Sequence, residues 1–306
     1  MTAGEGAGAD ADGRLLAFVG GLHRSPTPVT SWLGEHPSVS AFRDTGVSGD
    51  EGQHLQDVYR TAETHGGPGR FALDPEAHLT ESSPLVSAKS RERLWASWSP
   101  RWDLSKPVLV EKSPPNLVRT RFLQALFGHG TRFVIVIRHP IAVSAATRKW
   151  NYWGRGRKRL LEHWLAAHEL ILDDAAAVDH LAIVRYEDVV ADPAAELGHV
   201  FRFLGLEPVE CDWQTKPGLN NRYFERWQPG AIFDRWSRMP NPFMRAAVRR
   251  LESRFEDRVA RFGYSLRDPQ ALSAPAPEVA RHLPGVLAAT ATDTASASRR
   301  PPLAPR

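Results

Sequence analysis

Residues 15–28 carry the sequence LLAFVGGLHRSPTP, and this stretch decides the fold. It opens with Leu15 to Val19, an apolar run with the length of a strand that is buried on both faces. Two glycines and a short loop follow, and the sequence from Val29 to Glu35 then indicates a helix. We predict a strand, a loop and a helix in succession, in which the helix N-terminus offers backbone N–H groups to a phosphate.

Arg24 is the only strongly basic residue of this loop. A kinase-type phosphate loop would end in Gly-Lys-Ser/Thr, and that ending is missing here. A glycine turn followed by one arginine is weak evidence for phosphate binding when it stands alone. The function therefore has to be inferred from several motifs together.

Three further apolar runs indicate strands, and the segments between them indicate helices. Asp192 and Pro193 mark the N-cap and the first position of one helix, which Gly205 ends. A longer helix opens at Asn241 and has an apolar face that continues almost to Gly263. This alternation predicts an α/β fold with a mostly parallel central sheet flanked by helices. The three apolar runs are Val108 to Val110, Phe133 to Ile137 and Leu181 to Arg185.

The composition predicts one folded domain, because 306 residues with 42% hydrophobic content can bury one substantial core. We assign residues 1–13 to a disordered tail, 14–266 to the domain and 267–306 to a low-complexity tail rich in Pro, Ala and Ser. No apolar run approaches the roughly 20 residues of a membrane helix, and the first residues do not resemble a signal peptide. The single cysteine, Cys211, excludes an internal disulfide and favours a reducing compartment, so we expect a cytoplasmic protein.

The charge of the chain bears on its partners. The net charge is +4 and the isoelectric point is about 9.4. This balance fits arginine-lined pockets for phosphate or sulfate better than a broad nucleic-acid surface, so we expect no nucleic-acid partner. The twelve histidines show no spacing that demands a metal, and we expect no metal site.

Five short motifs occur in order along the chain. They are the glycine–arginine–serine loop at residues 21–25, Glu111 to Pro114, Arg138 to Pro140, Tyr186 to Asp188 and Phe203 to Leu206. Together they resemble the sulfotransferases that use PAPS (3′-phosphoadenosine 5′-phosphosulfate), closest to the bacterial and tyrosylprotein-type branch, over residues 15–264. The resemblance implies a P-loop-like sulfotransferase fold. It also implies transfer of a sulfuryl group from PAPS to a hydroxyl or amine, with PAP (adenosine 3′,5′-bisphosphate) as the product.

The resemblance further implies which residues bind the nucleotide. The loop would hold the 5′-phosphosulfate, and Arg138 would grip the 3′-phosphate with its planar fork of donors. Tyr186 would lie near the adenine, and Arg222 would be a second contact to the 3′-phosphate. The loop residues implied in binding are Gly21, His23, Arg24, Ser25, Pro26 and Thr27.

The chain departs from the family pattern at two places. Family members usually carry a serine eight positions after the arginine, and here that position is Ala146, with Ser144 nearby as the candidate hydroxyl. Pro26 and Pro28 stand where the family has a glycine and a hydroxyl residue. We expect Pro28 at the first helical position, where proline is tolerated, and Pro26 inside the loop, where it removes an N–H donor.

The resemblance also places the catalytic groups. Lys112 matches a lysine close to the transferring group, where it and Arg24 would stabilise developing negative charge. The acceptor must lose a proton as it attacks sulfur, which calls for a general base. Glu51 is the first candidate, and His54, three residues on and on the same face of an expected helix, is the second.

Structural interpretations of the same residues remain open. Arg138 and Lys112 could be exposed charges at strand ends, Tyr186 a core aromatic, and Asp50 and Glu51 acids at a helix start. The alternative function is a catalytically degenerate nucleotide-binding or scaffold protein of the same fold, which the loop prolines support. A P-loop kinase is disfavoured by the missing Lys-Ser/Thr. The acceptor, whether a small molecule, a carbohydrate or a peptide, is not identified by the sequence.

Overall fold

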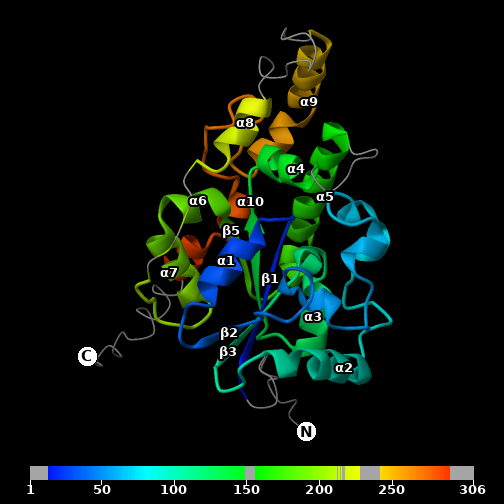
Figure 1. Cartoon of the computed structure of the whole chain (residues 1–306), viewed down its shortest axis with the longest axis vertical. Coiled ribbons are helices and arrows are strands. Elements are labelled where there is room, and N and C mark those ends of the chain that lie inside the picture. The colour runs from blue at the N-terminus through cyan, green and yellow to red at the C-terminus, as the bar shows by residue number, and fades with distance from the viewer. Residues whose placement is uncertain are drawn as a thin grey trace, which may run out of the picture.

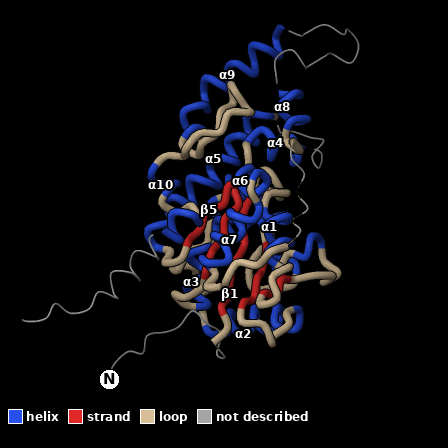
Figure 2. The backbone as a smooth tube through the Cα atoms, turned by 90° about the vertical axis from the view of Figure 1, so that its left-hand side faces the viewer, coloured by secondary structure: helices blue, strands red, loops and turns tan. Residues whose placement is uncertain are grey.

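A five-stranded sheet forms the centre of the computed structural model, which describes residues 13–148, 156–211, 213, 215, 218–227 and 242–289. The strands lie in the order β2-β3-β1-β4-β5, and each neighbouring pair is parallel. Figure 2 shows the strands in red within the surrounding helices. The predicted α/β class with a parallel central sheet is therefore confirmed. The strands are β1 (Leu15–Gly21), β2 (Val39–Ala41), β3 (Val108–Lys112), β4 (Arg132–Ile137) and β5 (Leu181–Arg185).

Helices cover both faces of the sheet (Figure 1). Successive side chains of a strand point to opposite faces, so Leu16 and Phe18 of β1 enter one core and Ala17 and Val19 enter the other. The first core is completed by α2 (Ala88–Trp98), α3 (Thr120–Phe127) and α5 (Arg157–Asp174), and the second by α1 (Pro26–Leu33), α6 (Tyr186–Ala191) and α7 (Pro193–Phe203).

The other helices lie around the edges of these layers. Figure 1 shows α4, α8 and α9 beyond the end of the sheet toward which the strands run. None of the helices in the described ranges is both long enough and apolar enough to cross a membrane. The remaining helices are α4 (Pro140–Arg148), α8 (Asn221–Trp227), α9 (Pro242–Ala260) and α10 (Pro277–Ala280).

The predicted elements agree with the structure where the local signals were strong. The run at residues 181–185 coincides with β5, and the other three apolar runs are found as β1, β3 and β4. The capping interpretation of α7 is also confirmed, because the side chain of Asp192 accepts a hydrogen bond from the N–H of Ala195 at 3.0 Å. The short strand β2 was not predicted, since three residues carry little periodicity. Asn241, the expected start of the long helix, lies outside the described residues.

The chain directly after residue 266, which the sequence analysis assigned to a tail, packs against the domain. Val279 is fully buried in the first core. The carbonyl of His282 accepts a hydrogen bond of 2.8 Å from the N–H of Ile183 on the edge strand β5. A composition rich in Pro and Ala concealed this because the segment docks largely through hydrogen bonds, such as that from Arg185 to the carbonyl of Ser273 at 2.7 Å, which leave no apolar periodicity in the sequence. Residues 1–12 and 290–306 lie outside the described ranges.

The order of the strands creates a ligand position. The chain leaves β1 to build β2 and β3 on one side and then crosses to build β4 and β5 on the other. In open parallel sheets, ligands bind at the carboxyl ends of strands where this reversal occurs. The register places Lys112 opposite Val19, and Val136 opposite Gly21. The loop after β1 therefore lies between the ends of β3 and β4.

Gly21 ends β1 in a conformation that other residues rarely adopt, with φ at 150°. A Cβ atom on Gly21 would lie 2.5 Å from the carbonyl oxygen of Val136, so the neighbouring strand leaves no room for a side chain. We expect Gly21→Ala to lower the free energy of unfolding by about 2 kcal/mol or more, because strain and steric overlap act together. Chemical denaturation measures this change.

Gly198→Ala is the matched control. Gly198 lies inside α7, and a Cβ atom there would meet Pro208 at an ordinary 3.6 Å. Replacing a helical glycine with alanine where there is space is expected to be neutral or to stabilise by up to about 1 kcal/mol. Equal stability of the two variants would contradict the assignment of strain to Gly21.

Candidate active site

The loop after β1 closes tightly onto helix α1. Ser25 donates its N–H to the carbonyl of Leu22 at 2.9 Å and forms the N-cap of α1. Arg24 has a φ of 66°, the left-handed region, which costs a non-glycine residue about 1 kcal/mol or more. Backbone strain of this kind concentrates where a ligand is held. The exposed Arg24 side chain thus stands at the mouth of the loop.

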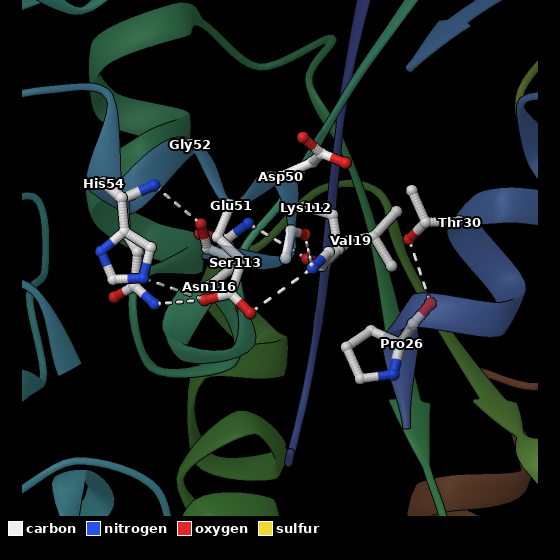
Figure 3. Close-up of polar contacts among 12 residues, drawn as sticks. Val19, Pro26, Thr30, Asp50, Glu51, Gly52, His54, Lys112, Ser113 and Asn116 are labelled. Carbon is white, nitrogen blue, oxygen red and sulfur yellow. Dashed lines mark hydrogen bonds and ion pairs between the residues drawn. The ribbon is translucent and has the colours of Figure 1, made fainter. Parts of the chain in front are cut away.

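Helix α1 begins earlier than expected, at Pro26 rather than at Val29. The expectation for Pro28 is therefore wrong: Pro26 occupies the first helical position and Pro28 the third. The helix has formed at this point, since the Thr30 hydroxyl donates to the Pro26 carbonyl at 3.1 Å (Figure 3). Of residues 26–28 only Thr27 keeps an N–H group, so the helix start offers fewer backbone donors than usual. Side chains must therefore supply part of the binding that the two missing N–H groups would otherwise give an anion in this loop.

Two serines near the loop have hydroxyl groups without a hydrogen-bond partner among the described residues. Ser25 is fully buried, and Ser144 on α4 is 5% exposed. Most buried hydroxyls find a partner, and an unsatisfied one calls for an explanation such as an absent ligand. Ala146, the family position for the phosphate-binding serine, instead packs in the hydrophobic core. Ser144 on α4 therefore provides the buried hydroxyl group whose missing hydrogen-bond partner a ligand would supply.

Arg138 follows β4 and is buried beside the loop. Its guanidinium donates two hydrogen bonds to Oδ1 of Asn220, at 3.1 and 2.5 Å. It also stacks over the ring of Tyr186 at 4.3 Å. A further contact of 3.5 Å reaches the carbonyl of Arg24 and connects this arginine with the phosphate loop. The exposed-charge interpretation of Arg138 is excluded, since the residue is only 4% exposed.

Glu187 holds Asn220 in position behind Arg138. Its Oε1 accepts from Nδ2 of Asn220 at 2.7 Å and from the N–H of His139 at 3.1 Å, and its Oε2 accepts from the hydroxyl of Tyr264 at 2.8 Å. Burial raises the pKa of Glu187, an effect that these donors oppose. The sequence analysis assigned no functional role to Glu187 or Asn220, since nothing local indicates that they meet.

A cavity of about 460 Å³ opens against Tyr186 and Asn220, the residues that hold Arg138. Its other walls come from α8 and the segment after α9, including Phe224 and Leu272. The volume and mixed lining suit a small organic ligand. Arg222, also on α8, donates to the hydroxyl of Tyr223 at 2.7 Å, and no contact joins it to Arg138 in the described structure.

A second group of charged residues lies on the other side of the loop. Nζ of Lys112 donates to the carbonyl of Gly49 at 2.5 Å and lies 3.4 Å from Oε1 of Glu51. Oε2 of Glu51 lies 3.6 Å from Nε2 of His54. Figure 3 shows Glu51 between Lys112 and His54. The structure therefore brings three predicted catalytic residues into one cluster.

The electrostatics of this cluster separate its two candidate bases. Burial by itself would raise the pKa of Glu51, but the close contact with His54 and the charge of Lys112 outweigh it and lower the pKa. The same contact with Glu51 raises the pKa of His54. Burial lowers the pKa of His23, and the charge of Arg24 acts in the same direction. Glu51 thus rests as a carboxylate, while the proton is favoured on His54.

The segment around Glu51 is not the expected helix. Single 3₁₀ turns at Ser48–Asp50 and Gly52–His54 flank an extended Glu51. The carboxylate of Asp50 accepts hydrogen bonds from the N–H and hydroxyl of Thr45, at 2.8 and 2.6 Å, and so closes this turn. Glu51 and His54 still meet, because a 3₁₀ turn also aligns residues three positions apart.

Glu111, to which the sequence analysis assigned no role, holds the segment around Glu51 in place through buried hydrogen bonds. Its Oε1 accepts from the N–H of Gly52 at 2.9 Å and from the hydroxyl of Ser113 at 2.6 Å, and its Oε2 accepts from Asn116 at 2.5 Å. The indole of Trp98 donates to the carbonyl of Gly52 at 3.0 Å. Complete burial raises the pKa of Glu111 to about 7, although its hydrogen-bond donors oppose that effect.

In the described ranges, no group of three or more His, Cys, Asp or Glu side chains is arranged to hold a metal ion. The site instead consists of arginine, lysine and hydroxyl groups around the loop after β1. The fold and these groups define an α/β protein with a basic, hydroxyl-bearing loop at the carboxyl edge of its sheet, the position where open parallel sheets bind ligands.

Comparison with known proteins identifies the family. Residues 17–211 match the model of the sulfotransferase family, which is more than half of the chain. The chain therefore belongs to the sulfotransferase family, a family of transferases, and the resemblance seen in its motifs is confirmed. No curated protein matches its sequence.

Several solved structures have a similar backbone and a distant sequence. The sulfotransferase domain from the Synechococcus PCC 7002 olefin synthase is 16% identical, covering 82% of this chain and 95% of that one, with a TM-score of 0.45. A sulfotransferase from Alicyclobacillus acidocaldarius is 12% identical, covering 80% and 96%, with a TM-score of 0.41. A sulfotransferase from Mycobacterium tuberculosis H37Rv is 15% identical, covering 80% and 77%, with a TM-score of 0.47.

The raised pKa of Glu111 predicts a pH-dependent stability. Between about pH 4.5 and 7 the folded protein keeps a proton that the unfolded chain has released, so the free energy of unfolding falls as pH rises. The loss amounts to about 3 kcal/mol at about 1.4 kcal/mol per pH unit. We expect Glu111→Gln to remove this slope, whatever constant destabilisation it adds. Denaturation of both proteins between pH 4.5 and 8 measures it, and parallel curves would contradict the assignment.

Proposed function

We propose that this protein transfers a sulfuryl group from PAPS to a hydroxyl or amine of an acceptor. The observation that carries the proposal is the position of the Lys112–Glu51 pair next to a phosphate loop whose other side holds Arg138. A cation, a carboxylate and a phosphate-binding arginine around one loop are the groups that such a transfer requires. The family membership supports the same reaction class.

The donor would bind across the carboxyl edge of the sheet. The loop with Arg24 and Ser25 would hold the 5′-phosphosulfate, and Arg138 with Ser144 the 3′-phosphate. The two unpartnered hydroxyls fit this assignment, because phosphate oxygens would supply the missing hydrogen-bond partners. The cavity beside Tyr186 offers space for the adenosine.

The chemistry assigned to the charged cluster is an in-line displacement. Glu51 takes the acceptor proton as the acceptor oxygen or nitrogen bonds to sulfur, and the bond between sulfur and the phosphate oxygen breaks. Lys112 and Arg24 stabilise the negative charge that grows on the leaving phosphate. The low pKa of Glu51 keeps it ionised and able to accept a proton, whereas the raised pKa of His54 favours its protonated form. Glu51 is therefore the preferred base.

The wider proposal is a protein that acts without a metal, without a nucleic-acid partner and in the cytoplasm. The single cysteine, Cys211, supports a reducing compartment. Its acceptor is a small molecule, a carbohydrate or a peptide.

A binding protein without turnover is the second candidate. Pro26 and Pro28 favour it, because they remove two backbone donors from the helix start that faces the 5′-phosphosulfate. Thermal-shift measurements with PAP, PAPS and ATP separate the possibilities, since a ligand that binds the folded protein raises its melting temperature. Stabilisation by PAP without turnover over a broad acceptor panel would favour the binding protein, and a preference for ATP would contradict both.

Arg138→Ala tests the nucleotide site. We expect PAP to bind about 10- to 100-fold more weakly, the effect of losing a hydrogen bond to a charged group. Titration calorimetry measures the affinity, and the melting temperature of the free protein shows whether the fold is intact. Arg91→Ala on the exposed face of α2 is the control and should bind PAP as the wild type does. Unchanged affinity in Arg138→Ala would remove this arginine from the site.

Glu51→Gln tests the general base. We expect turnover to fall by about 100-fold or more while PAP affinity is retained, because the amide cannot accept the proton. His54→Gln should lower turnover less and shift its pH profile, since the pKa of Glu51 rises when this partner is lost. If His54→Gln has the larger effect and Glu51→Gln the smaller, the base is His54.

A further inference from the structure

A second cavity lies at the opposite edge of the sheet, where the strands begin. It measures about 720 Å³. Arg132 at the start of β4 and Leu181 at the start of β5 form its floor, the end of α7 forms one wall, and residues 281–288 form another. Arg132 and Arg138 lie at the two ends of β4, about 20 Å apart at the rise of an extended strand. A ligand in this cavity is therefore separate from one in the active site.

Three arginines from different parts of the chain converge on this cavity. Arg132 comes from β4, Arg202 from α7 and Arg281 from the segment after α10. Two histidines, His180 and His282, complete the basic lining. Segments far apart in the sequence thus place basic side chains around one cavity. Basic residues that were merely exposed to solvent on a helix would not need to converge in this way.

These arginines lack acidic partners. In the described part of the chain no salt bridge joins Arg132, Arg202 or Arg281 to a carboxylate, although many other arginines have one. Asp179 is the one acidic residue in the lining, and it is bound to His129 at 2.6 Å. With neutral histidines the lining therefore carries an excess of two positive charges. Such an excess attracts an anion.

Arg132 shows the clearest need for a ligand. Its Nε is buried and has no hydrogen-bond partner, and burial lowers the pKa of the guanidinium. One face of the guanidinium is taken by the ring of Phe203, 5.5 Å away. A partly buried arginine without an acceptor costs free energy that an oxyanion would recover.

The rest of the cavity lining is apolar and suits a ligand that has an apolar part beside its anionic group. Val178, Leu181, Phe203 and Leu287 face the cavity. The volume lies within the range of pockets for small organic molecules and exceeds what an inorganic ion would fill. Arginine forks pair with phosphate oxygens two at a time, and a phosphate monoester carries close to two negative charges at neutral pH.

We propose that this cavity binds a small phosphate monoester with an apolar or aromatic body. The phosphate is held by Arg132, Arg202 and Arg281, and the body lies against Phe203 and Leu287. The site is independent of the proposed sulfuryl transfer and of the groups around Arg138.

The experiment is titration calorimetry with 1-naphthyl phosphate as the probe. We expect Arg202→Gln to weaken binding about tenfold or more, the effect of losing one charged donor. Arg202 is exposed and makes no side-chain hydrogen bond in the described structure, so the fold should be retained. Arg281→Gln is the second variant and should behave in the same way. Arg91→Gln on α2 controls for the loss of one surface charge and should leave binding unchanged.

Two further measurements locate the probe. Arg138→Ala should bind 1-naphthyl phosphate like the wild type, because Arg138 lies at the other edge of the sheet. Neither 1-naphthol nor inorganic phosphate should approach the affinity of the ester. Wild-type affinity in both Arg202→Gln and Arg281→Gln, or loss of binding only in Arg138→Ala, would overturn the proposal. No detectable binding to the wild-type protein would overturn it as well.

Discussion

The carboxylate of Glu111 accepts three hydrogen bonds in the buried centre of the protein, and the arrangement of the proposed catalytic groups depends on them. One comes from Gly52, which follows Glu51, and another from Asn116, which also donates to the carbonyl of Val19 at 3.1 Å. One buried group thus connects β1, β3 and the segment that carries the general base candidate. Removing one donor would leave a costly unsatisfied acceptor, so these parts are held in one arrangement.

The loop after β1 departs from the family pattern at the start of helix α1. Pro26 and Pro28 set the backbone of α1 and remove N–H groups from its first turn. In the proposed donor site, side chains such as Arg24 and Ser25 would then contribute more to binding, and they depend more on rotamer and charge than a fixed backbone does. The strained φ of Arg24 and its carbonyl contact with Arg138 connect the two halves of the site.

Much of the fold could be predicted because its signals are local. The apolar run of β5 and the Asp192 cap each lie within a few residues, and the same is true of the arginine after β4. The support of that arginine could not be predicted, because Glu187 and Asn220 lie 33 positions apart and meet only in the folded chain. The 3₁₀ turns around Glu51 could not be predicted for a related reason. Hydrogen bonds to residues far away in the sequence set the geometry of these turns. The basic cavity likewise combines residues from four elements.

The contact between His282 and β5 has a consequence for solution behaviour. β5 is an edge strand, and an edge strand with free backbone groups pairs readily with a strand of another molecule. The segment after residue 266 covers part of this edge through the N–H of Ile183 and packs Val279 beneath it. A chain ending at residue 266 would present a ready template for intermolecular β-pairing. In the full chain, the segment occupies the N–H of Ile183 and so removes one donor from that template.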